Sequence, residues 1–246
     1  MSFLYLLIAL FASSLGSIVL AGLFVLLKKN DIEKISLYLI YFAGGTLLGA
    51  SLLVMIPKTL ELLSVDLTFR LILIGVLFFF LMEKFILWRT CYNKGCERQI
   101  NAMAPMILIG DAFHNAIDGI VIAASFLISP KIGFFVTFSV ILHEIPQELG
   151  DFGILIKSGL SKKKAIFYNL ISGSTAIFMG ILAFFFLDKL QILIPYALAF
   201  SASSFLYIAL ADLIPQMHKK TLLKDSIIQS LLIDLGVLLI FCLVKN

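Results

Sequence analysis

Two short motifs in adjacent apolar stretches carry most of the side chains that could do chemistry. The first reads H-N-A-I-D-G from His114 to Gly119, and the second reads H-E-I-P-Q-E-L-G-D from His143 to Asp151. Imidazole nitrogen combined with carboxylate and carboxamide oxygen suits borderline divalent cations such as Zn²⁺, Fe²⁺ and Mn²⁺. Such polar groups are costly in hydrocarbon, so a cluster of them at membrane depth indicates a functional site. The motifs therefore predict a metal-binding site.

Helical spacing and a short connection predict that the two motifs meet. The stretches are separated only by a turn around Ser129–Lys131, so they should be antiparallel neighbours. Pro146 removes a backbone donor and crowds the carbonyl four residues back, which predicts a kink near Leu142. Residues four apart share a helix face, which pairs His114 with Asp118, His143 with Gln147, and Glu144 with Glu148. We also expect three glycines to allow close backbone approach: Gly119, Gly150 and Gly153.

The elements that position these motifs must be membrane helices. Hydrophobic residues make up 61% of the 246 residues and charged residues only 14%, against roughly 45–50% apolar residues in soluble domains. Segments of about 20 apolar residues span a bilayer, and helices satisfy their own backbone groups there. The predicted fold is an all-α polytopic membrane protein in a single transmembrane domain, 1–246, with eight helices at about 3–27, 35–56, 69–89, 104–128, 132–156, 165–187, 190–214 and 226–244.

The distribution of basic residues predicts the orientation. If the N-terminus lies outside, the loops after the first, third, fifth and seventh spans carry fourteen Lys and Arg residues, against five on the other side. The positive-inside rule then selects an N-out, C-out arrangement. The net charge of +4 reflects this topology, with anionic lipid as the neighbour, and requires no nucleic-acid partner.

The acidic residues inside the predicted spans outnumber their basic partners. Only Lys84 and Arg89 are basic there. The acids within spans are Asp111, Asp118, Glu144, Glu148, Asp151, Asp212 and Asp234. Buried charges are normally paired or bind metals, so we expect a mobile cation. Asp111, Asp151 and Asp212 are candidates for its pathway, Asp212 as an exit ligand, and Asp234 is a candidate for a helix contact or dimer seam.

The motifs resemble those of the ZIP (Zrt/Irt-like protein) family of divalent-metal transporters. In that family the fourth helix carries H-N-x-x-D-G and, in one large branch, the fifth carries H-E-x-P-H-E-x-G-D. The likeness extends to E-K-F at Glu83–Phe85 with Trp88, and to L-Y-I-A-L-A-D-L-I-P at Leu206–Pro215. It covers essentially the whole chain.

The resemblance implies a 3+2+3 arrangement of the eight helices and alternating access by movement of the metal-bearing helices. It implies a principal metal site and an adjacent one, and homodimers are common in such proteins. The principal site would contain His114, Asp118, His143 and Gln147, and the adjacent one Asn115, Glu144 and Glu148. Gln147 stands where that branch has His; its neutral amide is a weaker ligand and a poor bridge, so we expect one good site with a weakened neighbour.

The predicted function is transport of a divalent metal into the cytoplasm, Zn²⁺ before Fe²⁺ or Mn²⁺. The metal is the substrate, no catalytic cofactor is expected, and the expected location is the plasma membrane of a prokaryote. One alternative is an intramembrane metalloprotease, in which H-E-x-x-H supplies two His ligands and a Glu base. Gln147 removes the second His and Pro146 disrupts that helix, so we do not expect an enzyme. The other alternative is a membrane scaffold or receptor, which leaves the excess of acids unexplained.

Overall fold

The computed structural model describes residues 2–24, 29–91, 96–218 and 222–245. Within these ranges, side chains are described except at 2, 24, 29–34, 36, 86–91, 96–107, 154, 157, 212, 216 and 243–245. The described residues contain helices and no strand. The elements are α1 Ser2–Phe11, η1 Ala12–Gly16, α2 Ser17–Phe24, α3 Lys29–Gly49, η2 Ala50–Met55, α4 Ile56–Leu60, α5 Val65–Cys91, α6 Cys96–Ile128, α7 Pro130–Lys157, α8 Lys162–Lys189, η3 Gln191–Leu193, α9 Ile194–Tyr207, η4 Ile208–Leu213, α10 Ile214–Met217 and α11 Leu223–Lys245. This confirms the predicted all-α class.

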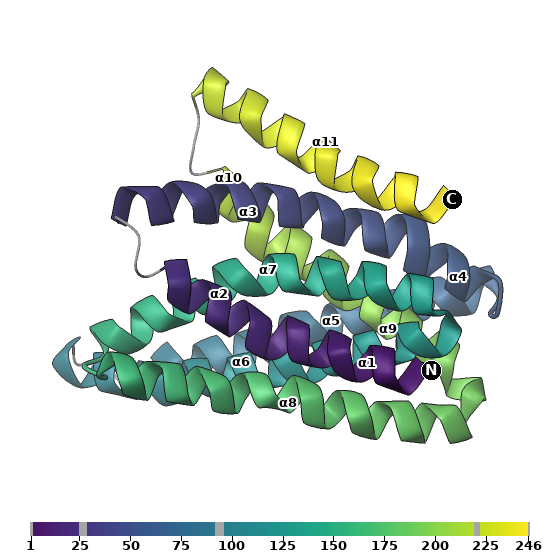
Figure 1. Cartoon of the computed structure of the whole chain (residues 1–246), viewed down its shortest axis with the longest axis horizontal. Helices are drawn as coiled ribbons and strands as arrows, with labels where there is room; N and C mark the ends of the chain where they lie inside the picture. The colour runs from purple at the N-terminus through teal and green to yellow at the C-terminus, as the bar shows by residue number, and fades with distance from the viewer. Residues whose placement is uncertain (1, 25–28, 92–95, 219–221, 246) are drawn as a thin grey trace.

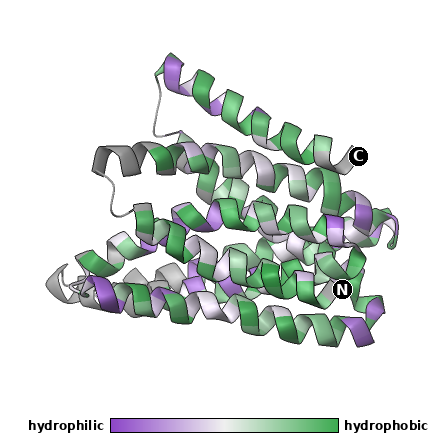
Figure 2. Cartoon of the chain, viewed as in Figure 1, coloured by the Kyte–Doolittle hydropathy of each residue, from purple (hydrophilic) through white to green (hydrophobic). Residues whose placement is uncertain are grey.

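Within the described ranges, consecutive elements join into eight helical rods. The rods run back and forth along one axis (Figure 1). The start of α1 and the end of α11 lie toward the same end of the bundle, as an N-out, C-out arrangement requires (Figure 1). Hydrophobic residues follow most of each rod, with hydrophilic residues at helix ends and in the central part of the bundle (Figure 2). Polar groups are therefore grouped where helices α6 and α7 lie.

Seven helices of the described chain are long and apolar enough to cross a membrane. They are Phe3–Leu23, Leu37–Leu60, Val65–Phe85, Leu108–Ile128, Lys162–Lys189, Gln191–Ala211 and Leu223–Cys242. The eighth predicted span, 132–156, forms helix α7 but contains Glu144, Glu148 and Asp151. The count of eight spans and the 3+2+3 arrangement stay predictions.

Two of the three π-helical segments in the described chain end two residues before a proline. A proline cannot donate its backbone N–H and crowds the carbonyl four residues earlier. That carbonyl belongs to Leu53 for Pro57 and to Ala211 for Pro215, and both residues lie inside π-helical segments, η2 and η4. The wider turn gives the freed carbonyl room. Pro146 lies inside α7, which is assigned as one continuous helix; the kink near Leu142 stays a prediction.

Glycines decide how closely several helices approach. A Cβ on Gly119 of α6 would strike the backbone of α8 at Ala176 and Gly180, which confirms the predicted close contact at that position. A Cβ on Gly150 or Gly153 would meet no atom within 4 Å. The prediction for those two glycines is wrong, because a small residue permits a close contact but does not determine which face of the helix meets a neighbour.

Candidate metal centre

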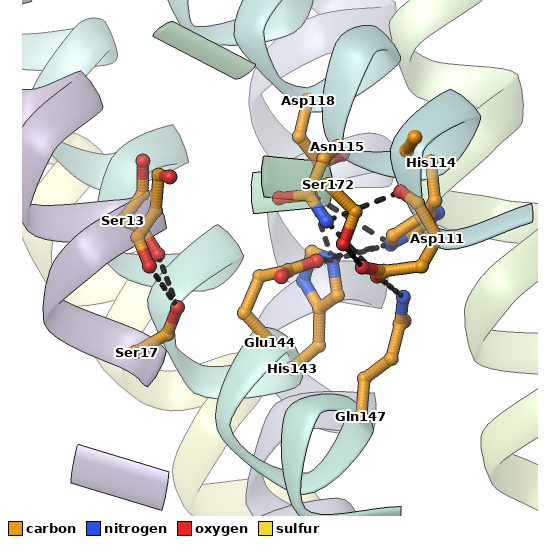
Figure 3. Close-up of polar contacts among 12 residues, drawn as sticks. Ser13, Ser17, Asp111, His114, Asn115, Asp118, His143, Glu144, Gln147 and Ser172 are labelled. Carbon is orange, nitrogen blue, oxygen red and sulfur yellow. Dashed lines mark hydrogen bonds and ion pairs between the residues drawn. The ribbon is translucent and has the colours of Figure 1, made fainter. Parts of the chain in front are cut away.

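Helices α6 and α7 bring the two motifs together. Helix α6 ends at Ile128 and α7 begins at Pro130, and the two helices pack against each other. The predicted antiparallel pair is therefore present, with His114 and Asp118 on one helix and His143 and Glu144 on the other (Figure 3). These four residues place ligand atoms within 4.8 Å of one another.

The atoms of this His-carboxylate group lie at short range. His143 Nε2 is 3.0 Å from Asp118 Oδ2 and 3.2 Å from His114 Nε2. Glu144 Oε1 is 3.3 Å from His114 Nε2 and 3.7 Å from His143 Nε2. His143, Asp118 and Glu144 are 1–2% exposed. Two nitrogens and two carboxylates thus converge on one point inside the bundle.

A hydrogen bond to the backbone fixes which nitrogen of His143 faces this point. Its Nδ1 lies 3.0 Å from the Ser139 carbonyl oxygen, which can only accept, so Nδ1 carries the proton. In the neutral ring Nε2 then has a free lone pair and no proton to give to Asp118. A histidine held in this way by a carbonyl is the usual arrangement of a metal ligand. In that neutral form, the lone pair and the Asp118 oxygen 3.0 Å away can both bind one cation.

A second group is made only of carboxylates. Asp111, Glu144 and Glu148 also place oxygens within 4.8 Å of one another. Glu144 belongs to both groups, so it is the residue that can bridge two adjacent cation positions. All three acids are buried. Glu144 is thus the carboxylate shared by the two groups.

Asp111 is held by three donors from three helices. Asn115 Nδ2 donates to Asp111 Oδ1 at 2.9 Å, Gln147 Nε2 donates to the same oxygen at 3.2 Å, and the Ser172 hydroxyl donates to Oδ2. Figure 3 shows these side chains around the Asp111 carboxylate. Gln147 therefore contacts Asp111, whereas Glu144 contacts the two histidines.

Several buried acidic oxygens have no hydrogen-bond partner among the described residues. They are both carboxylate oxygens of Asp118, Glu144 and Glu148. Buried polar atoms are nearly always satisfied, and a buried charge without a partner is costly. Two of these six oxygens, Asp118 Oδ2 and Glu144 Oε1, lie against histidine nitrogens, and the other four have no such neighbour among the described residues. A cation shared by the two groups would satisfy them.

The pathway candidates differ in how far they can be placed. Asp111 lies in the carboxylate group. Asp151 is partly buried and lies about one turn after Glu148 on α7. The side chains of Asp212 and Trp88 lie outside the described residues.

The sequence reading missed two residues of α8. Ser172 bonds Asp111, and Asn169 is 2% exposed with an unpartnered Oδ1. Both belong to a run of polar and small residues three or four positions apart, Asn169, Ser172, Gly173, Ala176 and Gly180, all of them buried. That spacing marks the buried face of α8, which meets α6 at Ser172 and Gly180 and meets η1 and α2 at Gly173, and it was visible in the sequence.

Comparison with known proteins supports a relationship to metal transporters. The family description "ZIP Zinc transporter" matches residues 90–244, which include every residue of both groups. The chain is 40% identical over 139 residues to "Zinc transporter foi" of Drosophila melanogaster, covering 56% of this chain and 19% of the relative. It is 39% identical over 132 residues to "Metal cation symporter ZIP14" of Mus musculus, covering 53% and 27%, and 32% identical over 156 residues to "Zinc transporter ZIP10" of Danio rerio, covering 60% and 18%. The matched part is thus about a quarter or less of these relatives' length.

Proposed function

The chain belongs to the ZIP zinc transporter family, and from this and its buried ligand groups we propose that it carries a divalent transition-metal cation across a membrane. The observation that supports this best is the placement of His143, whose Nδ1 lies against the Ser139 carbonyl while its Nε2 faces Asp118 at 3.0 Å. The family and the seven apolar helices of the described chain make it an integral membrane protein. The printed names of its relatives are those of zinc or metal-cation carriers.

We assign the cation two adjacent positions. His114, Asp118, His143 and Glu144 bind it first, and Asp111, Glu144 and Glu148 offer a second position with oxygen ligands only. Asn115 and Gln147 orient Asp111 through their amide groups. Since the first set combines nitrogen with oxygen ligands, it favours Zn²⁺, with Fe²⁺ and Mn²⁺ as alternatives.

The proposed direction is into the cytoplasm by alternating access. The cation exchanges water for the His-carboxylate ligands from outside, and a shift between outward-open and inward-open states releases it inside. Helices α6 and α7 carry the ligands, and they pack against α9 and α3 respectively, where relative movement would change access. A plasma membrane is the proposed location; relatives from animals give no support for a prokaryotic one.

Helix α11 supports the proposal of a homodimer. It lies at the edge of the bundle (Figure 1) and packs mainly on α3. Asp234, near its centre, is exposed and forms no hydrogen bond or ion pair within the described part of the chain. Exposed Ile227, Leu231 and Leu238 flank it at spacings of three and four residues, as in a helix-pair seam. An unpartnered Asp234 would face hydrocarbon at a free-energy cost of about 3 kcal/mol. A second copy of the chain would cover it.

Cross-linking of the protein in lipid vesicles tests the dimer. We expect a dimer for the wild-type protein and a shift toward monomer for Leu231→Trp. A population that is monomeric in both would contradict the α11 interface. Association with lipid alone, or with a different membrane protein, would do the same.

Uptake into proteoliposomes tests the transport proposal. Purified protein would be compared for Zn²⁺, Fe²⁺, Mn²⁺ and Cd²⁺, as wild type, His143→Ala and His218→Ala. His218 is exposed and belongs to neither ligand group, so it is a matched control. We expect uptake by the wild type and His218→Ala, and little by His143→Ala. Equal uptake by all three would refute the assignment of His143, and no uptake by the wild type would refute transport. Proteolysis is not proposed, because position 147 lacks the imidazole that the protease motif requires.

A further inference from the structure

A small cavity beside the carboxylate group has unused acceptor atoms. It is lined by Glu148 of α7 and Asn169 of α8, and by residues of α2 that include Ile18 and Gly22. Glu148 is 1% exposed and Asn169 is 2% exposed. Both side chains are thus removed from the surroundings of the protein and have only the cavity and their neighbours to contact.

The polar atoms that line this cavity lack donors. Both carboxylate oxygens of Glu148 and Oδ1 of Asn169 have no hydrogen-bond partner among the described residues. An acceptor that is buried without a donor is penalised by its full desolvation. Carboxylate and amide oxygens are ligands for divalent cations, and most of the other wall residues are apolar. This combination of three acceptors in an apolar wall suits a cation and excludes an anion.

The cavity adjoins the metal centre, because Glu148 belongs to both. Glu148 is also a member of the carboxylate group, and Asn169 precedes by three residues Ser172, which bonds Asp111. From Glu148, α7 continues toward its end at Lys157, and α8 begins at Lys162, before Asn169. The cavity therefore lies between the metal centre and the lysine-rich end of the bundle that the charge pattern assigns to the cytoplasm.

We propose that Glu148 and Asn169 form a transfer site for the divalent cation on its way from the centre to the cytoplasmic end. This inference rests on the proposed transport function. Asn169 supplies a neutral carbonyl oxygen, and Glu148 supplies the only charge among the described residues of the cavity wall. A pair with one charge and no nitrogen holds a transition metal more weakly than the His-carboxylate group does. It therefore receives the cation when Glu148 turns from the carboxylate group, and it releases the cation readily.

The test separates transfer from binding at the centre. Asn169→Leu removes the oxygen but keeps a side chain of similar size. We expect the initial rate of Zn²⁺ uptake in proteoliposomes to fall about tenfold, as for loss of a supporting ligand contact. We expect the Kd for Zn²⁺, measured on the purified protein, to stay within about threefold because the His-carboxylate ligands are unchanged. Asn169→Ala serves as a second variant should the leucine fail to fold, and Asn169→Asp, which retains an oxygen, should keep more uptake than either.

Three results would overturn the inference. The first is wild-type uptake rate in Asn169→Leu or Asn169→Ala. The second is a loss of uptake matched by an equal loss of Zn²⁺ affinity, which would make Asn169 a support of the centre. The third is equal loss of uptake in Asn169→Asp and Asn169→Leu, which would assign the role to the amide N–H. Absence of uptake by the wild-type protein would instead refute the proposed function itself, and the transfer site with it.

Discussion

Glu144→Gln is the substitution that best tests the geometry of the centre. Glu144 is the residue common to the two ligand groups, and its Oε1 lies 3.3 Å from His114 Nε2. Glutamine keeps the size and shape of the side chain while it removes the negative charge and one acceptor oxygen. The change therefore affects the ligands and leaves the packing of α7 nearly as it was.

The expected magnitude follows from the position of Glu144. Loss of a group that only supports a ligand weakens metal binding about 10- to 100-fold. Glu144 is itself placed as a ligand and is charged, so we expect the upper end of that range, about 100-fold in Kd for Zn²⁺. At about 1.4 kcal/mol per factor of ten, this is about 2.8 kcal/mol. Competition with a fluorescent zinc chelator on purified protein measures the Kd directly.

Two further variants make the result interpretable. Gln147→Ala removes an amide that bonds Asp111, so we expect a weaker effect of about tenfold. Glu61→Gln repeats the same chemical change at an exposed acid paired with Lys58, and it should leave the Kd unchanged. If Gln147→Ala weakens Zn²⁺ binding as much as Glu144→Gln, the assignment of Glu144 as the shared ligand is wrong and the sequence-based choice of Gln147 is preferable.

Three other predictions follow from particular contacts. Gly119→Ala should lower the melting temperature of the purified protein because its Cβ strikes Ala176, whereas Gly150→Ala, which meets open space, should not; equal effects would contradict the close packing of α6 on α8. Ser172→Ala removes the hydroxyl donor to Asp111 and should slow Zn²⁺ uptake, by up to about tenfold, without lowering the protein's yield; unchanged uptake would show that this donor is dispensable. Because protons compete with a metal for imidazole nitrogen, uptake at subsaturating Zn²⁺ should decrease from about pH 7.5 to about pH 5.5, and a constant rate would count against His ligation.

The meeting of the two motifs was predictable because it depends on local rules. Spacing of four residues placed His114 with Asp118, and a short turn made α6 and α7 antiparallel. The relative register of the two helices was not predictable in this way. In the structure His114 lies opposite His143. Because the helices are antiparallel, Asp111, three residues before His114, then lies near Gln147, four residues after His143, and these two side chains are in contact. Gln147 thus lies roughly 6 Å along the axis from His143, at the level of Asp111.

The closeness of Glu144 to the two histidines was not predictable for a related reason. A helix turns roughly 100° per residue, so His143 and Glu144 were assigned to different faces. In the structure both contact His114, because ligand groups converge from a broad arc of α7. Which residues of such an arc reach one point depends on the rotation of the helix about its axis, and that rotation is set by packing against other helices.

The order of ligands along α7 gives the proposed transport pathway a direction. His143 provides nitrogen, Glu144 and Glu148 provide only carboxylate oxygen, and the proposed transfer site adds the neutral oxygen of Asn169. A transition metal is bound more weakly when nitrogen is lost from its ligands, and the transfer site also has fewer charges than either group. A carrier must bind its ion well enough to select it and weakly enough to release it. Strong ligands at the middle of the bundle followed by weaker ones toward the Lys157 end would meet both requirements. If Asn169→Leu left uptake unchanged, the proposed weak site would have no part in release.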